Sequence, residues 1–286
     1  MPELPEVETV RRGLAPILVG RTLKRALTKR GDLRFPFPQR FAKRLEGARV
    51  TALKRRAKYL LAALDTGEVW TMHLGMSGRF VVYKPEAPKR PLGDFYYAEP
   101  PDPAHTHVVV ETDKGARIEY NDPRRFGYMD LIAAAELESH PWFAGLGPEP
   151  LEPAFSGAHL AAMFKGKRTS VKAALLDQRV VAGLGNIYVC EALFRTRIDP
   201  RRLAGRISRP RLDALADEVR AVLNEALDAG GSTLRDYAAA DGREGRFQQR
   251  FRVYDREGEG CRTCNRAVKR VVQAGRSTFF CAHCQR

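Results

Sequence analysis

The chain has 286 residues, a formal net charge of +15 and no apolar run that approaches the length of a membrane span. These values predict a soluble, cytoplasmic protein with two or three compact units, and they argue against a membrane-spanning or secreted one. A chain this basic most often binds a polyanion, and nucleic acid is the commonest. The alternatives are a charge that only confers solubility and a polybasic membrane patch. Both fit less well, because no amphipathic anchor is present and the bases are clustered at residues 54–58, 124–125, 165–168 and 243–252.

The first residues place a proline directly after the initiator methionine. Removal of Met1 would leave Pro2 as a secondary amine, and an α-amino group has a reference pKa of roughly 7.7–8.0, so part of it is neutral near pH 7. Such an amine can attack a sugar or carbonyl carbon and form an iminium, and Glu3 beside it can move protons. The alternative is structural: Pro5 opens a helix, with Glu6 and other acids near its positive end.

Residues from about 20 to 132 are typical of short strands separated by turns, at 48–64, 69–74, 79–83, 107–112 and 117–120. This spacing predicts a β-sandwich or flattened barrel. Residues 85–103 hold six prolines and predict an exposed loop.

Residues 141–153 are rich in proline and glycine and predict a linker. Helical patterns follow. A glycine-punctuated turn brings Asn186 to the start of a helix that runs to Arg195, where backbone amides and the Asn186 side chain form a natural phosphate site. The alternative role for Asn186 is a plain helix N-cap. A later apolar stripe predicts a second helix that ends at Gly230-Gly231, and its residues are Leu212, Leu215, Val219, Val222 and Ala226.

Four of the five cysteines lie near the end of the chain, as two C-x2-C pairs separated by 16 residues. This spacing predicts one structural zinc ion held by four thiolates, Cys261, Cys264, Cys281 and Cys284. Two disulfides are the alternative, which a basic intracellular protein seldom keeps. The fifth thiol, Cys190, has the spacing of a buried helical residue.

Several of these segments together resemble the bacterial formamidopyrimidine-DNA glycosylase family. The similar segments are PELPEVET (2–9), RRAKYL (55–60), HLGMSG (73–78), DPRRFG (122–127), GNIY (185–188) and RSTFFC (276–281). They occur in the family's order and span nearly the whole chain. The resemblance implies a multidomain α+β protein with an N-terminal β-sandwich and flanking helix, a helix–two-turns–helix domain and a C-terminal zinc-finger β-hairpin. The expected limits are 1–135 for the catalytic domain, 136–153 for the linker, 154–240 for the helical domain, and 241–286 for a lesion-capping loop and the zinc finger.

The resemblance also implies roles for particular residues. Met76, Arg124 and Phe126 match the side chains that fill the gap left by an extruded nucleotide, and an unbranched apolar chain, a guanidinium and a ring suit that task. For Met76 and Phe126 the alternative is core packing. Residues that match phosphate ligands are Lys58, His73, Asn186 and Arg276, and two further expected DNA contacts from the basic clusters are Arg125 and Lys167.

The implied activity is base-excision repair of oxidised purines, such as 8-oxoguanine and formamidopyrimidines, in damaged double-stranded DNA. Pro2 would attack C1′ and expel the base, Glu3 would protonate the ring oxygen, and β,δ-elimination would follow. Lys58 and Arg276 join Pro2 and Glu3 in the expected catalytic set. A monomer with one zinc ion, associated with the nucleoid and not with a membrane, is expected.

Two other functions remain open. One is an endonuclease VIII-type glycosylase for oxidised pyrimidines, and the other is a non-catalytic zinc-containing DNA-binding protein. The segment 85–106, which includes Phe95, is longer than the resemblance leads us to expect, and it is either an inert insertion or an added contact. The segment 241–250, where we place the lesion-capping loop, is the least motif-like part.

Overall fold

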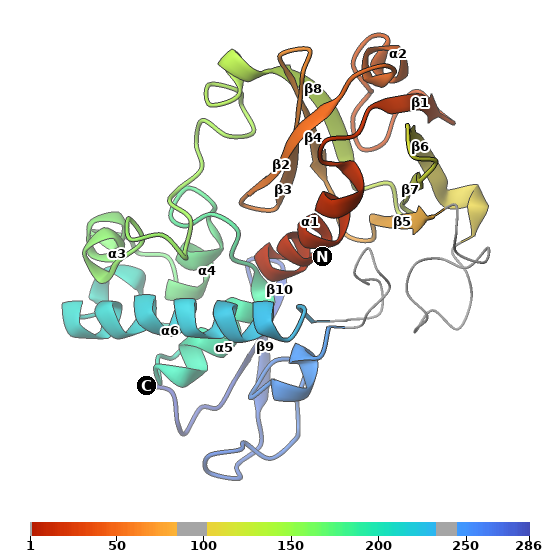
Figure 1. Cartoon of the computed structure of the whole chain (residues 1–286). Coiled ribbons are helices and arrows are strands. Elements are labelled where there is room, and N and C mark those ends of the chain that lie inside the picture. The colour runs from red at the N-terminus through yellow and green to blue at the C-terminus, as the bar shows by residue number, and fades with distance from the viewer. Residues whose placement is uncertain (1, 85–101, 233–244) are drawn as a thin grey trace. The chain divides into compact units, whose positions relative to one another are not determined.

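The computed structural model describes residues 2–84, 102–232 and 245–286 (Figure 1). The chain forms two compact units, which are described separately below. The first unit comprises Met1–Ala144 and Ala229–Arg246, and the second comprises Gly145–Asp228 and Phe247–Arg286. The domain limits expected from the sequence stay a prediction. Most of the proline-rich loop, including Phe95, and the first part of the expected lesion-capping loop, at 241–244, lie outside the described residues.

The first unit contains two antiparallel four-stranded sheets. In one, the strand order is β1-β6-β7-β5, and its strands are Leu23–Thr28, Thr106–Thr112, Arg117–Asn121 and Arg79–Tyr83. In the other, the order is β2-β3-β4-β8, and its strands are Val50–Arg56, Tyr59–Leu64, Glu68–His73 and Tyr128–Ala133. Helix α1 (Leu4–Leu18) packs against β2 and β3, and the short helix α2 (Phe41–Leu45) packs against β1 (Figure 1).

One continuous apolar core joins both sheets and α1. Helix α1 contributes Val7, Val10, Leu14 and Leu18, which recur at helical spacing and face the core. The predicted β-sandwich with a flanking helix is therefore confirmed. One strand prediction is wrong: the segment 48–64 is two strands, β2 and β3, joined by a two-residue turn at 57–58. The turn contains no glycine, asparagine or aspartate, so the usual sequence signal is missing.

The second unit begins with helices and ends in a two-stranded ribbon. Its helices are α3 (Gly157–Phe164), α4 (Val171–Leu176), α5 (Asn186–Arg195) and α6 (Arg209–Asp228), and its strands are β9 (Lys269–Gln273) and β10 (Arg276–Phe280). Short 3-10 turns in the chain are Pro103–His105, Ala134–Glu136, Ala204–Arg206 and Phe247–Arg250. Among the described residues, none of the helices combines the length and the apolar character that crossing a membrane requires.

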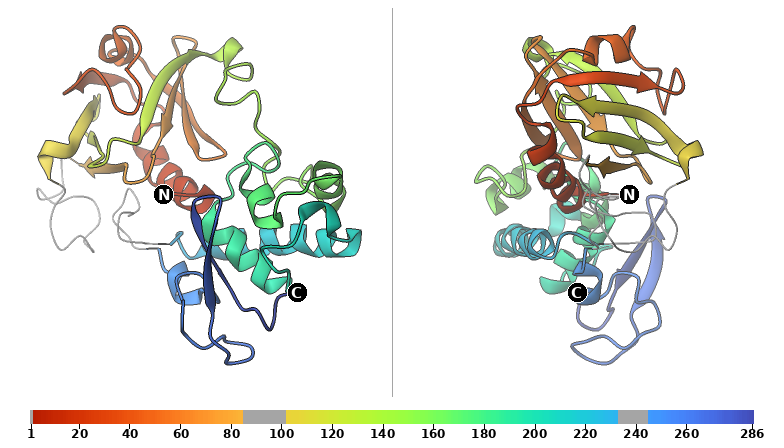
Figure 2. Two further views of the ribbon diagram at one scale, coloured as in Figure 1. Left: turned by 180° about the vertical axis from the view of Figure 1, so that it is seen from behind. Right: turned by 45° about the vertical axis from the view of Figure 1, so that its right-hand side comes forward.

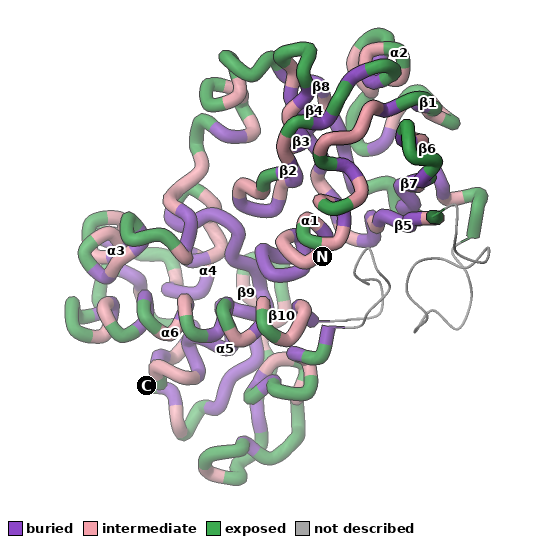
Figure 3. The backbone as a smooth tube through the Cα atoms, in the orientation of Figure 1, coloured by how far each residue is buried: buried purple, intermediate pink, exposed green. Residues whose placement is uncertain are grey.

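The predicted helices of the second unit are confirmed. The predicted stripe of α6 is buried along its whole length, and buried segments alternate with exposed ones along this helix in Figure 3. Helix α5 starts at Asn186 and ends at Arg195, and it packs against α6 and β10. Figure 2 shows the slender β9–β10 ribbon from two further directions. The helical segment and the zinc-finger hairpin both belong to the second compact unit.

Candidate functional site

The amino-terminal residues are held firmly in the first unit. Pro2 is buried, and Glu3, which is 3% exposed, precedes the first turn of α1 as its N-cap. The backbone N–H of Glu3 donates to the Glu6 carboxylate at 2.9 Å, which is one half of a capping box. Chain ends usually fray unless something ties them down. Here the capping box fixes the backbone beside Pro2.

Glu6 also reaches a second segment of the same unit. Its other carboxylate oxygen accepts hydrogen bonds from the backbone N–H of Ser232 at 2.8 Å and from the Ser232 hydroxyl at 2.9 Å. Glu6 is only 2% exposed, so these bonds satisfy a buried carboxylate. The N-terminus of α1 and the segment at 232 are thus fixed to one another. The sequence suggested only that Glu6 favours the positive end of the helix.

Lys58 lies in the tight turn between β2 and β3. The preceding residue, Ala57, adopts the left-handed conformation with φ of 51°, as two-residue hairpin turns require. The tip of this turn is buried, since Ala57 is 1% and Lys58 is 7% exposed. A buried lysine is uncommon unless it is paired or functional. The turn therefore sets the position of Lys58 closely.

His73 ends the central strand β4 between two tyrosines. It pairs with Tyr59 on β3 and with Tyr128 on β8, and its ring stacks on that of Tyr128 with centroids 4.7 Å apart. The Nδ1 atom of His73 accepts from the backbone N–H of Gly75 at 3.0 Å. Burial, and then the positive charges of Lys58 and Arg34, lower the pKa of His73 to about 3. At neutral pH the ring is therefore uncharged, with its proton on Nε2, where it can donate a hydrogen bond.

This depressed pKa predicts an acid-sensitive first unit. Below pH 6.5 the unfolded chain binds a proton at His73 and the folded chain does not. The free energy of unfolding is therefore highest above pH 6.5 and decreases as pH falls from 6.5 towards 3. Between pH 7 and pH 5 the wild type should lose about 1 to 2 kcal/mol more unfolding free energy than His73→Gln, allowing for partial solvent screening. Both tryptophans, Trp70 and Trp142, lie in the first unit, so urea unfolding can be followed by their fluorescence.

The matched control is His105→Gln, which changes a partly exposed histidine of the same unit. This variant should keep the wild-type difference between pH 7 and pH 5. Equal pH dependence in the wild type and in His73→Gln would show that His73 is charged in the folded protein at pH 5.

The three expected wedge residues come from two neighbouring loops of the first unit. Met76 is partly buried, whereas Arg124 is exposed and Phe126 is 44% exposed. The guanidinium of Arg124 lies over the Phe126 ring, 4.8 Å from its centroid. The exposure of Phe126 argues against the alternative of core packing. Arg125, between them, is exposed with φ of 57°.

In the second unit, Asn186 is the first residue of α5 and its N-cap is Gly185. The alternative of a plain N-cap for Asn186 is therefore wrong. The Asn186 side chain donates from Nδ2 to the carbonyl oxygen of Ser277 at 2.9 Å, next to the exposed Arg276 on β10. The buried Oδ1 of Asn186 has no hydrogen-bond partner among the described residues. Asn186 and strand β10, which carries Arg276, are thus directly linked. Lys167 lies elsewhere in this unit, on the loop after α3, and is half-buried.

Sequence reasoning missed two buried charges that organise this second unit. Lys172 is fully buried and donates from Nζ to the Ser277 carbonyl at 2.9 Å and to the Thr278 hydroxyl at 2.6 Å. Glu191, also fully buried, accepts from the backbone N–H groups of three consecutive residues, 252–254, at 2.9 to 3.1 Å. Helical periodicity could not have found them, because a charge on a helix normally indicates a solvent-facing position.

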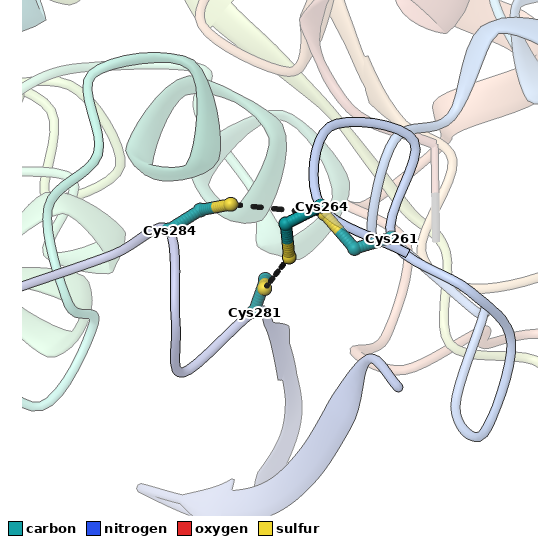
Figure 4. A group of neighbouring side chains, drawn as sticks. All are labelled: Cys261, Cys264, Cys281 and Cys284. Carbon is teal, nitrogen blue, oxygen red and sulfur yellow. Dashed lines mark hydrogen bonds between the residues drawn. The ribbon is translucent and has the colours of Figure 1, made fainter. Parts of the chain in front are cut away.

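The four C-terminal cysteines converge on one point (Figure 4). Their sulfur atoms all lie within 4.8 Å of one another, with 3.9 Å between Cys261 and Cys284 and 3.5 Å between Cys264 and Cys281. A tetrahedral zinc with Zn–S bonds of about 2.3 Å requires sulfur atoms about 3.8 Å apart. The cysteines therefore fit one structural zinc ion. Cys190 is buried in an apolar cluster that also includes Cys261 and Cys281, which confirms the predicted burial of its thiol.

The expected site residues thus fall into two sets. The first unit holds Pro2, Glu3, Lys58, His73, Met76, Arg124, Arg125 and Phe126. The second unit holds Lys167, Asn186, Arg276 and the four cysteines.

Three family models match the chain and together span most of its length. They are the formamidopyrimidine-DNA glycosylase N-terminal domain at residues 1–129, the formamidopyrimidine-DNA glycosylase H2TH domain at 146–238, and the zinc finger found in FPG and IleRS at 258–286. A formamidopyrimidine-DNA glycosylase from Phenylobacterium zucineum is 61% identical, with 100% of both chains covered.

Solved structures agree with these matches. MutM (Fpg) from Thermus thermophilus is similar with a TM-score of 0.85 and 41% identity, covering 99% of this chain and 98% of that one. Fpg from Lactococcus lactis in complex with abasic-site DNA is similar with a TM-score of 0.87 and 30% identity, covering 99% of both chains. A variant of the Lactococcus lactis protein bound to DNA containing Fapy-dG has a TM-score of 0.86 and 31% identity over the same share of both chains.

Proposed function

The chain belongs to the formamidopyrimidine-DNA glycosylase family and is a base-excision repair DNA glycosylase, and from this premise we propose that it removes oxidised purines from damaged duplex DNA. AP lyase activity is known for the family, and we assign it here to β,δ-elimination from an adduct on Pro2. The complex of a relative with Fapy-dG DNA supports the purine preference over the pyrimidine one. A non-catalytic role is disfavoured, because the relatives that match over the full length are enzymes.

The observation that carries the proposal is the fixed amino terminus. Pro2 and Glu3 are buried at the start of α1, and the backbone N–H of Glu3 is held by the Glu6 carboxylate, to which it donates. A nucleophile gains most from being held in one orientation. A terminal proline with no chemical role would not need this restraint.

The proposed chemistry begins at the Pro2 nitrogen once Met1 has been removed. The nitrogen lone pair forms a bond to C1′ while the glycosidic bond breaks and its electron pair leaves with the base. The nitrogen then loses its proton, which the departing base takes up. The freed lone pair expels O4′ as the C1′–O4′ bond breaks and Glu3 gives a proton to that ring oxygen, which leaves a cationic iminium between the Pro2 nitrogen and C1′. Loss of a C2′ proton expels the 3′ phosphate, and a second elimination expels the 5′ phosphate.

The damaged nucleotide must leave the base stack before this attack is possible. We assign the filling of the gap to Met76, Arg124 and Phe126. The exposed pair of Arg124 and Phe126 supports this role, because the guanidinium lies over the ring and the two side chains can enter the base stack together.

We assign the phosphate contacts to Lys58, His73, Asn186 and Arg276, with Arg125 and Lys167 as further DNA contacts. The neutral His73 ring would donate through Nε2–H, and Asn186 lies at the first turn of α5, where the helix dipole favours an anion. The four cysteines hold zinc as a structural ion and take no part in the chemistry. Association with the nucleoid is part of this proposal, since the substrate is chromosomal DNA.

The phosphate assignment predicts a change in salt dependence. Arg276→Gln should weaken binding to a duplex with a non-cleavable abasic analogue, and the slope of log K against log salt should fall by about one. The matched control is Arg270→Gln, on the facing strand of the same hairpin. Arg270 contacts Glu257 and the Ser277 hydroxyl, so its loss should leave the slope unchanged. An unchanged slope in Arg276→Gln would remove Arg276 from the phosphate ligands.

The direct test of the nucleophile is borohydride trapping. Protein whose intact mass corresponds to loss of Met1 should form a covalent adduct with DNA carrying 8-oxoguanine opposite cytosine, and protein that keeps Met1 should not. Pro2→Gly should form far less adduct, because a primary amine in a looser chain is a poorer nucleophile and electron sink. Efficient trapping by the Met1-containing protein would exclude Pro2. A parallel substrate with an oxidised pyrimidine measures the lesion preference.

A further inference from the structure

Asp122 is a fully buried carboxylate at the end of β7, directly before the loop that carries Arg124 and Phe126. Its Oδ1 atom accepts from the Ser77 hydroxyl at 2.6 Å. Its Oδ2 atom accepts from the backbone N–H of Gly127 at 2.8 Å and from the Tyr120 hydroxyl at 3.3 Å. Ser77 follows Met76, and Gly127 follows Phe126. One carboxylate therefore binds both loops that carry the assigned wedge residues.

Two more features join these loops. The Ser77 hydroxyl, while it donates to Asp122, also accepts from the backbone N–H of Arg124 at 3.2 Å. The backbones themselves touch at Gly75, which has φ of 62° and where an added Cβ would lie 2.2 Å from the carbonyl carbon of Phe126. The loops therefore lie against one another directly and share a buried hydrogen-bond network.

We propose that Asp122 is a positioning residue that locks the Met76 loop to the Arg124–Phe126 loop, so that the three side chains enter the base stack as one rigid wedge. This proposal rests on the wedge role assigned above. Hydrogen bonds to a buried carboxylate are stronger than those between neutral groups, so the link resists separation of the loops. Side chains that enter DNA from exposed loops need such support, because a loosely held group is displaced by the stack it should open.

The test compares two substrates that differ in how much extrusion they require. Asp122→Asn keeps the size of the side chain but removes its negative charge, so the hydrogen bonds that join it to Ser77 and Gly127 lose their charge-assisted strength. Excision of 8-oxoguanine paired with cytosine should fall roughly 10- to 100-fold, as expected when a positioning contact is lost. Cleavage of a preformed abasic site, which is easier to extrude, should fall much less.

Ser77→Ala gives the same comparison with a smaller structural change, and it decides the matter if Asp122→Asn does not fold. Its matched control is Thr112→Val, which removes a buried hydroxyl that also accepts a backbone N–H bond, from Ala116, in the same unit but at the β6–β7 turn. Thr112→Val should change neither substrate's rate. A loss in Ser77→Ala that is equal on both substrates would overturn the proposal.

Combination with Phe126→Ala separates this proposal from the proposed function. If Asp122 acts through the wedge, the loss of 8-oxoguanine excision in the double variant Asp122→Asn/Phe126→Ala should be smaller than the product of the two single losses. Multiplied losses would show that Asp122 does not act through Phe126, even if the wedge itself is real. If Phe126→Ala slows both substrates equally, the wedge assignment fails, and the role of Asp122 fails with it.

Discussion

Glu3→Gln should bind damaged duplex DNA as tightly as the wild type and yet fail to excise 8-oxoguanine. The amide keeps the size of the carboxylate but cannot give a proton to the sugar ring oxygen. Loss of a general acid costs about 10²- to 10⁴-fold in rate. Single-turnover excision and equilibrium binding to an abasic analogue, measured on the same preparation, separate the two effects.

Glu8→Gln is the matched control on the same helix. Glu8 pairs with Arg11, Arg12 and Arg55, and hydrogen bonds and charge from these arginines hold its pKa below the ordinary value despite its partial burial. Its replacement should cost some stability and leave the excision rate of the folded protein nearly unchanged. Wild-type turnover in Glu3→Gln would refute the proton-donor role.

Loss of zinc should have the second large effect. Cys264→Ser should lower the zinc content from one equivalent to near zero, since three thiolates bind the ion far more weakly than four. Structural zinc contributes on the order of 10–16 kcal/mol in small zinc-binding peptides, so the region around β9 and β10 should unfold. Arg276 and the Ser277 carbonyl, which accepts from Asn186, would then lose their positions. DNA binding should fall accordingly.

The readouts for this variant are metal content, affinity for an abasic analogue, and tryptophan fluorescence. Trp70 and Trp142 belong to the first unit, so their urea transition should change little while affinity is lost. Undiminished affinity in a zinc-free sample would show that the zinc hairpin makes no DNA contact of consequence.

The sequence predicted those parts of the fold where local chemistry and packing agree. Helix α5 was predicted with its observed ends, because a glycine turn precedes Asn186 and an apolar stripe follows. The four cysteines were equally clear, since few other structures require that spacing. Residues 48–64 were predicted as a single run, because Ala57 enters the left-handed region without any residue that usually marks it.

Buried charges were the harder class to predict from sequence. Asp122 and Glu6 are surrounded by donors that come from distant parts of the chain, such as Ser77 and Ser232. Nothing in the neighbouring residues shows whether a carboxylate faces water or a cluster of N–H groups. Only tertiary contacts distinguish the two cases, and these are the residues that orient the site.

The bonds made by Glu191 bear on how this protein can be recombined with others. The zinc-bearing segment, residues 258–286, matches a family model of its own, yet the carboxylate of Glu191 on α5 holds the backbone just before it, at residues 252–254. The side chain of Gln285 donates to the carbonyl oxygen of Ile198, which ties the last residues to the same helical region. A chimera cut between residues 238 and 258 would separate donors from acceptors. The finger therefore depends on the helices of its own unit, and a graft of the finger alone should misfold even with zinc present.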